Sequence, residues 1–164
     1  MQKSFLVSWF FATRVLAVIN CFADAPFLRR VVVDDCADIF SIMQEGDKVW
    51  APMHFTREEG QGFTVPHRWH KTSCTVLIDM LEDGDDDSFP LGSIVQAASN
   101  IVRVCVMDSS MSGRGGRAII GPEKKMLLVV SGTLDPLPRP QDILFKANAS
   151  SFRTLSFLRN VNTS

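Results

Sequence analysis

The chain has 164 residues, of which 46% are hydrophobic and 21% are charged, and its formal net charge is -1. This length fits one domain with a sizeable core, and the composition excludes an intrinsically disordered chain. Basic residues are balanced by acidic ones and the densest charge cluster, Glu82 to Asp87, is acidic, so the charge argues against a nucleic-acid-binding protein.

Residues 1–25 have the layout of a secretory leader. A lysine lies near the start, two apolar blocks follow, and the tripeptide Ala23-Asp24-Ala25 forms a small-residue end of the A-x-A type. We therefore predict cleavage after the first or the second of these alanines. Arg14 interrupts the apolar run, so an uncleaved membrane anchor and a buried helix remain as alternatives.

The four cysteines of the chain are Cys21, Cys36, Cys74 and Cys105. Removal of the leader would take Cys21 away and leave three cysteines. Three cysteines allow one internal disulfide plus a spare thiol, or a bond to another chain. None of the spacings is C-x-x-C, so the pattern indicates neither a zinc knuckle nor a thioredoxin-type redox pair.

A helix and a short strand are expected after the leader. Residues 36–43 carry apolar side chains at the i, i+3, i+4, i+7 spacing of one buried helix face, and Asp34 or Asp35 can cap this helix. The charged stretch 47–62 is expected to be a loop. Residues 63–65 then form a short edge strand that ends at a proline.

The clearest elements lie in the middle of the chain. Residues from Cys74 to Met80 alternate between the two sides of an extended chain with one strongly apolar face, which predicts a strand. An acidic loop follows. Apolar residues between Ile94 and Cys105 then form a continuous stripe at helical spacing, with Pro90 in the first turn of this helix.

The last predicted element is a β-hairpin. Its strands are the apolar runs 117–120 and 126–130, which five residues connect. The order is then helix, strand, helix, strand, strand. We therefore predict an α+β fold in which two helices pack on a small, mainly antiparallel sheet of three to four strands. This domain covers 26–133, and 134–164 form a proline-containing linker and a poorly determined tail.

The segment HRWHKTSC at 67–74 brings two imidazoles and a thiol within eight residues. On a helix, His67, His70 and Cys74 could supply a zinc site, and Cys74 could also be a nucleophile with a histidine as its base. Cys74 begins an alternating strand, however, and residues three apart in extended backbone point to opposite sides. We therefore interpret the histidines as surface groups and expect no catalytic, cofactor or metal site.

Two further motifs are interpreted as structural. Glycine-rich residues 113–117 resemble a phosphate loop, but a helix leads into a strand here, which is the reverse of the order that such loops require. The acidic residues 79–87 do not match the ligand positions of an EF-hand calcium loop. We interpret residues 113–117 as a tight turn and residues 79–87 as a solvated acidic turn.

Three cysteines are expected to meet at one end of the sheet. The second helix must run antiparallel to the strand 74–80, which brings Cys105 to the level of Cys74, and Cys36 can fall at the same end. One disulfide that includes Cys105 is then feasible, and we prefer Cys74–Cys105 over Cys36–Cys105. Buried free cysteines are the alternative, and a cytosolic chain would favour them.

Several short motifs occur together between residues 34 and 132. They are Asp35-Cys36, Val65-Pro66 with Trp69, the strand from Cys74 to Asp79, Ala97 to Ile101 leading to Cys105-Val106, Gly115-Gly116 and Gly121. This combination is similar to small secreted cysteine-containing proteins of filamentous fungi. It also resembles, more faintly, the Ecp2-like effector domain, whose final cysteine has no match here. The resemblance implies secretion and a compact α+β domain held by cysteines, with no assigned catalytic activity.

The function expected from the sequence is that of a secreted, non-enzymatic protein. It would act at a cell wall or on a host or competitor partner, without a cofactor, without nucleic acid, and without stable membrane association once the leader is removed. Two alternatives remain open. One is a small hydrolase or metal-dependent enzyme that uses His67, His70 and Cys74, and the other is an interaction domain anchored in a membrane by an uncleaved N-terminus.

Overall fold

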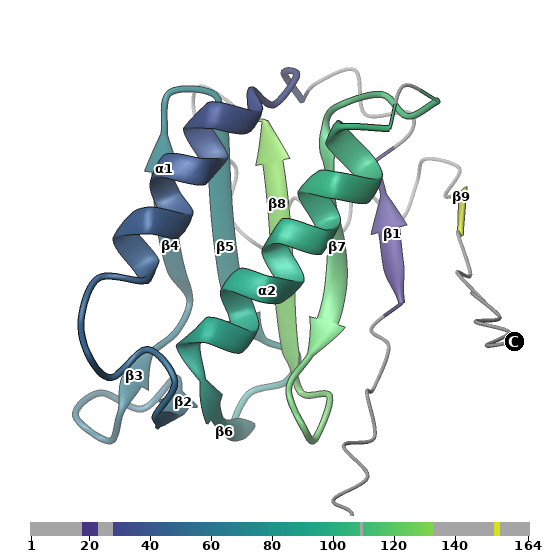
Figure 1. Ribbon diagram of the computed structural model, residues 1–164. Helices are drawn as coiled ribbons and strands as arrows, with labels where there is room; N and C mark the ends of the chain where they lie inside the picture. Colours follow the sequence, from purple (N-terminus) through teal and green to yellow (C-terminus); the bar gives the residue numbers. More distant parts are fainter. Residues whose placement is uncertain (1–17, 23–27, 109, 133–152, 155–164) are drawn as a thin grey trace, which may run out of the picture.

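Two helices, α1 (Val33–Met43) and α2 (Leu91–Ile101), lie on one face of a six-stranded sheet in the computed structural model (Figure 1). The structure describes residues 18–22, 28–108 and 110–132, and the backbone of 153–154. Helix α2 continues into a wider π-helical segment, η1 (Val102–Val106). The predicted α+β class, with two helices and mostly antiparallel strands, is confirmed.

The large sheet has the strand order β4-β5-β8-β7-β1-β9, and all its neighbouring strands are antiparallel. Its strands are β1 (Ile19–Cys21), β4 (His67–Lys71), β5 (Cys74–Met80), β7 (Gly115–Ile120), β8 (Met126–Gly132) and β9 (Arg153–Thr154). Strands β5 and β8 are paired along seven residues, from Cys74 opposite Gly132 to Met80 opposite Met126. This ladder is the centre of the domain.

A second, three-stranded sheet lies at one end of the large sheet (Figure 1). It consists of β3 (Phe63–Thr64), β2 (Pro52–Thr56) and β6 (Asp86–Pro90) in that order. Strand β2 is parallel to β3 and antiparallel to β6. Because β6 leads directly into α2, this small sheet sets the point at which the second helix begins.

The main core lies between the helices and the large sheet. The helix-facing side chains of β5 and β8 are apolar and fully covered, and they meet the buried stripe of each helix. Ile39 of α1 and Ile94 and Ile101 of α2 are among the largest side chains in this core. The 3.6-residue period of the helices and the two-residue period of the strands bring these apolar rows together.

Several predicted elements are confirmed. The strand 74–80 has the predicted bounds, and both helices occur where their apolar stripes indicated. The hairpin is also present, with β7 and β8 joined by residues 121–125. The glycine-rich segment 113–117 is a turn that leads into β7, and Gly115 has a φ of 97°, in the region that glycine favours.

The predicted sheet of three to four strands is wrong, because five strands of the structure had no clear signal in the sequence. They are β1, β2, β4, β6 and β9. Strand β4, with the sequence HRWHK, is at the edge of the large sheet and is mostly polar. Strand β6 begins inside the acidic cluster, where Asp87 is buried and accepts a hydrogen bond from the backbone of Ser88. Polar edge strands of this kind lack the apolar alternation that reveals a buried strand.

The expected end of the leader lies beyond a strand of the large sheet. Residues of β1 pair with β7, from Ile19 opposite Ala118 to Cys21 opposite Gly116. A cut after Ala23 or Ala25 would remove this strand from the sheet. The expected linker and tail at 134–164 lie outside the described residues, apart from the backbone of β9, which pairs with β1.

Truncation of a core side chain should destabilise the domain far more than truncation of a surface one. Ile94 of α2 is 0% exposed, whereas Ile42 of α1 is 53% exposed. We expect Ile94→Ala to lower the free energy of unfolding by about 2 to 5 kcal/mol, since it leaves a cavity. Ile42→Ala should change it by no more than about 0.5 kcal/mol. Urea unfolding followed by circular dichroism measures both values, and equal effects would contradict this core.

Candidate functional site

The segment HRWHKTSC forms strand β4, a tight turn and the first residue of β5. His67 lies opposite Ile78 and Trp69 opposite Val76, so both rings are on the helix-covered side of the sheet. His70 lies on the other side, where its Nδ1 is 3.2 Å from the Thr75 hydroxyl oxygen. The two imidazoles therefore do not converge, as the prediction of extended backbone required.

Cys74 has no free thiol, because it forms a disulfide with Cys36 of α1. A second disulfide joins Cys21 of β1 to Cys105 of η1, and the Cα atoms are 5.3 Å apart in each pair. The preferred pairing of Cys74 with Cys105 is therefore wrong. No cysteine in the described part of the chain is free.

The strand order explains why the preferred pairing fails. Helix α1 contacts β4 and β5, whereas α2 contacts β7 and β8, and the two helices lie side by side over different strands (Figure 1). Strand β8 separates β5 from β7. Two strand spacings amount to about 10 Å, which is too far for a bond between Cys74 and a cysteine above β7. The sequence pattern alone did not reveal that β8 lies between these two strands.

Both disulfides join segments that are far apart in the sequence. The Cys36–Cys74 bond spans a separation of 38 residues and the Cys21–Cys105 bond spans 84. In the loop-entropy model, closing such loops is worth on the order of 4 kcal/mol for the shorter one and slightly more for the longer one. Each bond also connects a helical segment to a strand. The disulfides therefore hold the two layers of the domain together.

Polar contacts surround the Cys36–Cys74 disulfide. Asp35 accepts hydrogen bonds from the Ser73 backbone N–H at 3.0 Å and from the Ser73 hydroxyl at 2.6 Å. The bond from the Ser73 hydroxyl has the larger effect and the bond from its backbone N–H the next, and both lower the pKa of the Asp35 carboxyl below its ordinary value. The Lys71 ammonium lies 2.8 Å from the Asp38 carboxylate. The first turns of α1 are thus held on the β4–β5 hairpin by one covalent bond and several polar contacts.

An aromatic cluster joins β4 to the small sheet. The ring of Phe63 is stacked on Trp69 with 6.0 Å between centroids, and His67 lies edge-on to Trp69 at 4.4 Å. Phe55 connects this group to Phe89 of β6. Burial lowers the pKa of His67, so the imidazole is neutral at neutral pH and packs as an apolar ring. The cluster is part of the packing between the two sheets.

Arg57 connects the small sheet to the end of β5. Its Nε donates to Asp79 Oδ1 at 3.0 Å, and its Nη2 donates to the Met80 carbonyl oxygen at 2.8 Å. Its Nη1 pairs with Asp83 in the acidic loop. Two of the acidic residues considered for calcium, Asp79 and Asp83, therefore pair with an arginine. Within the described ranges, no group of three histidine, cysteine or acidic side chains is placed to hold a metal ion.

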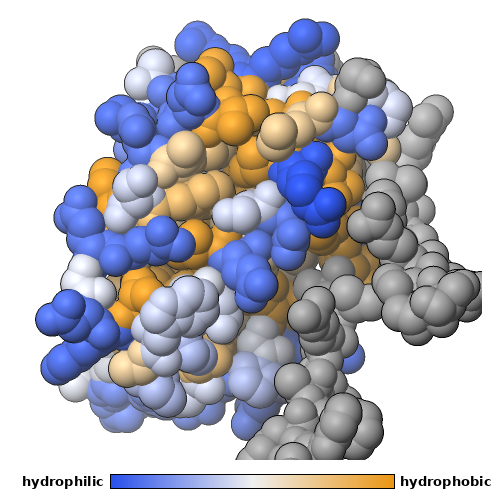
Figure 2. All heavy atoms as spheres, viewed as in Figure 1, coloured by the Kyte–Doolittle hydropathy of each residue, from blue (hydrophilic) through white to orange (hydrophobic). Residues whose placement is uncertain are grey.

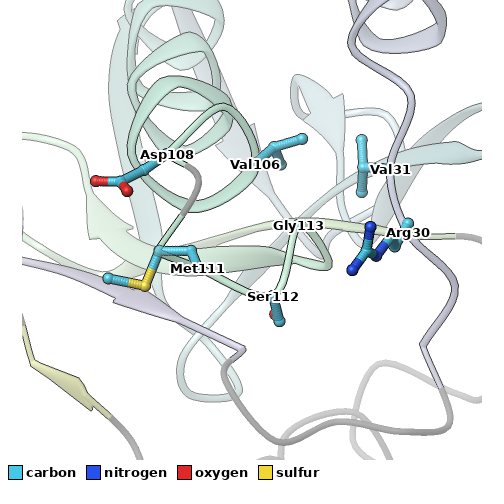
Figure 3. Close-up of a pocket in the computed structure, with 7 residues that line it drawn as sticks. All are labelled: Arg30, Val31, Val106, Asp108, Met111, Ser112 and Gly113. Atoms are coloured by element: carbon cyan, nitrogen blue, oxygen red, sulfur yellow. The ribbon is translucent and has the colours of Figure 1, made fainter.

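A shallow pocket of about 370 Å³ lies beside the end of η1 (Figure 3). It is lined by Arg30, Val31, Val106, Asp108, Met111, Ser112 and Gly113. Several polar groups of its wall are engaged within the protein, since Ser112 donates to the Phe22 carbonyl and Asp108 accepts from Ser110. In Figure 3 the Arg30 guanidinium reaches toward the pocket while the Asp108 carboxylate points away from it. The lining does not bring together a nucleophile and a base.

Trp50 is the most exposed large hydrophobic residue in the described part of the chain, at 64%. It precedes β2 and contacts the start of α2, where the Gly92 N–H donates to the Val49 carbonyl oxygen at 2.9 Å. A Cβ atom on Gly92 would overlap the six-membered ring of Trp50, so this glycine gives the indole the space that it occupies. The six-membered ring of the indole thus lies against the backbone of α2 while most of the residue remains exposed.

The helix-covered face carries apolar residues that polar ones interrupt (Figure 2). Exposed apolar side chains on and beside the helices include Val33, Ile42 and Met107. Scattered exposed residues of this kind are normal for a soluble surface. Trp50 differs from them because its ring lies against Gly92. From the sequence Trp50 was expected only to be part of a loop, and a tryptophan beside alanine and proline gives no local sign of this contact.

No helix in the described ranges is both long and apolar enough to cross a membrane. No known family model matches the chain, and neither a search of characterised proteins nor a search of solved structures finds a match.

The contacts between Asp35 and Ser73 should make stability depend on pH. Because the pKa of Asp35 is lowered in the folded state, its contribution is present above the ordinary value of 3.8 and is lost as the pH falls through the folded-state pKa. We expect Asp35→Asn to lower the free energy of unfolding at pH 7, and the difference from the wild type to shrink at acidic pH. Urea titrations between pH 2 and about pH 7 measure this difference.

Asp34→Asn is the matched control, because Asp34 lies in the same first turn of α1 but is exposed. Its effect should be smaller than that of Asp35→Asn. A difference between Asp35→Asn and the wild type that stays constant from acidic to neutral pH would contradict the role of the carboxylate.

Proposed function

We propose that this chain is a secreted protein that acts outside the cell by binding and not by catalysis. The observation that carries the proposal is the pairing of all four cysteines in two buried disulfides. Structural disulfides persist in oxidising compartments and are rare in the cytosol. The leader-like start of the sequence supports the same compartment.

The alternative of an enzyme that uses His67, His70 and Cys74 requires a free thiol and histidines on the same side of the sheet. A nucleophilic or zinc-binding role for Cys74 needs a thiolate, and its sulfur is bonded to Cys36. The histidines that would complete the site, His67 and His70, are on opposite sides of the sheet. The residues of HRWHKTSC are therefore better explained as structural parts of the β4–β5 hairpin. The third possibility, a membrane anchor formed by an uncleaved N-terminus within residues 1–25, concerns a segment of which 1–17 and 23–25 lie outside the described ranges.

The binding surface that we propose is centred on Trp50, and its ligand is a cell-wall polysaccharide. The indole face is flat, apolar and rich in π-electron density, which suits the flat row of C–H bonds on a pyranose ring. Ala51, Pro52 and Leu91 are also exposed or partly exposed beside it. An aromatic side chain has only two side-chain torsions and therefore loses little conformational entropy on binding, which favours affinity.

Secretion with oxidised cysteines is the first expectation. When the full chain is expressed in a eukaryotic secreting host, its product should appear in the medium with no cysteine open to alkylation until reductant is added. Reduction should then raise the intact mass by four hydrogen atoms and lower the free energy of unfolding by about 2 to 5 kcal/mol or more. Protein that stays in the cell with every cysteine open to alkylation would contradict the proposal.

Binding is tested by pull-down with insoluble chitin, β-1,3-glucan and cellulose. We expect the wild type to bind at least one of them and Trp50→Ala to bind it roughly tenfold more weakly, a difference of about 1.4 kcal/mol. Gly92→Ala keeps the tryptophan but displaces its ring, so it should also weaken binding.

Met107→Ala is the control, since Met107 is 62% exposed but follows η1, at the far end of the second helix from Gly92. It should bind like the wild type. Wild-type protein that binds none of the three polysaccharides, or a Trp50→Ala variant that binds equally well, would exclude the proposed contact and leave secretion unaffected.

A further inference from the structure

We infer that the secretory leader ends at Ala17 and that the mature protein begins at Val18. The inference rests on the proposed secretion and adds to it a specific processing site. It corrects the expected cut after Ala23 or Ala25, and it follows from what β1 does in the folded domain.

Strand β1 is an integral part of the sheet. Cys21 is 1% exposed and is bonded to Cys105, while Ile19, Asn20 and Cys21 each pair with a residue of β7. The contact continues past the strand, where the Phe22 N–H donates to the Gly115 carbonyl oxygen at 3.0 Å. A cut that leaves the domain intact must therefore lie before Ile19.

A later cut would leave the sheet and the core incomplete. Strand β7 would lose its partner β1 and expose the unpaired backbone of an edge strand. Cys105, which is 0% exposed, would be left as a lone buried thiol. The chain would then hold three cysteines for one remaining disulfide, which is an unfavourable count for a secreted protein.

Strand β7 also has a glycine at the position where β1 and Cys105 approach it closely. Gly116 pairs with Cys21, and a Cβ atom at Gly116 would overlap the Cys105 sulfur and the Asn20 carbonyl oxygen. A residue with a side chain could not bring the strand and the sulfur this close. The absence of a side chain at this position fits a mature domain that retains both Cys21 and its strand.

The sequence before Val18 is a better leader than residues 1–25. It has a basic residue at Lys3, an apolar run over 5–12, and uncharged side chains at the third-last and last positions, Val15 and the small Ala17. Arg14, which interrupted the longer candidate, now lies after the apolar run, between it and the cleavage site.

The new chain end would be compatible with the fold. Val18 is 59% exposed, so an ammonium group created there remains hydrated and costs no burial. Two residues, Ile19 and Asn20, then separate the new terminal residue from the disulfide at Cys21. The charged amine would lie just before β1 and would leave its pairing with β7 unchanged.

The test is N-terminal sequencing and intact mass of the full chain secreted by a eukaryotic host. We expect the first residue to be Val18 and all four remaining cysteines to be oxidised. Ala17→Phe puts a bulky residue at the cleavage site and should abolish cleavage there. Ala23→Phe, the matched control, should leave the wild-type N-terminus unchanged.

The outcomes separate this inference from the proposed function. A secreted protein that begins at any other residue overturns the inference, and a start at Asp24 or Pro26 with Cys105 open to alkylation does so while secretion stands. Cleavage of the Ala17→Phe variant at the wild-type position would overturn it as well. Cell-retained protein that keeps Met1 overturns the proposed secretion and the inference together.

Discussion

The pairing of β5 with β8 is the constraint on which the other contacts depend. These strands are matched along seven residues, and both are buried throughout their length. Helix α1 is attached to the start of this ladder through Cys36–Cys74, and the small sheet is attached to its other end through Arg57 and Asp79. Weakening the ladder would therefore loosen the helix and the small sheet at the same time.

The two disulfides stabilise different parts of the domain. One joins α1 to β5, and the other joins η1 to β1, so each crosses from the helical layer to the sheet on a different side of β8. Between them they restrain sliding of the helices over the strands. The proposed contact through Trp50 would gain from this restraint, because an interaction loses affinity when the groups that make it move.

The sequence revealed those parts of the fold whose signal is local. The alternation from Cys74 to Met80 and the apolar stripe of α2 were recognised because one element carries the whole pattern. Edge strands β4 and β6 were missed because charged residues replace the alternation, and β1 was missed because its apolar residues extend the leader-like run. The cysteine pairing and the position of Trp50 on Gly92 depend on strand order and packing, which no local pattern contains.

Strand β4 is the terminal strand of the large sheet, and the exposed residues Arg68, His70 and Lys71 lie along it. An open strand edge is a template on which a second copy can add its own strand, and basic side chains are a common defence against such polymerisation. In two copies brought together through β4, the Arg68 side chains would add like charge along the shared edge, whereas Lys71 is paired with Asp38. The polar residues that hide this strand from sequence patterns therefore also help to keep neighbouring molecules apart.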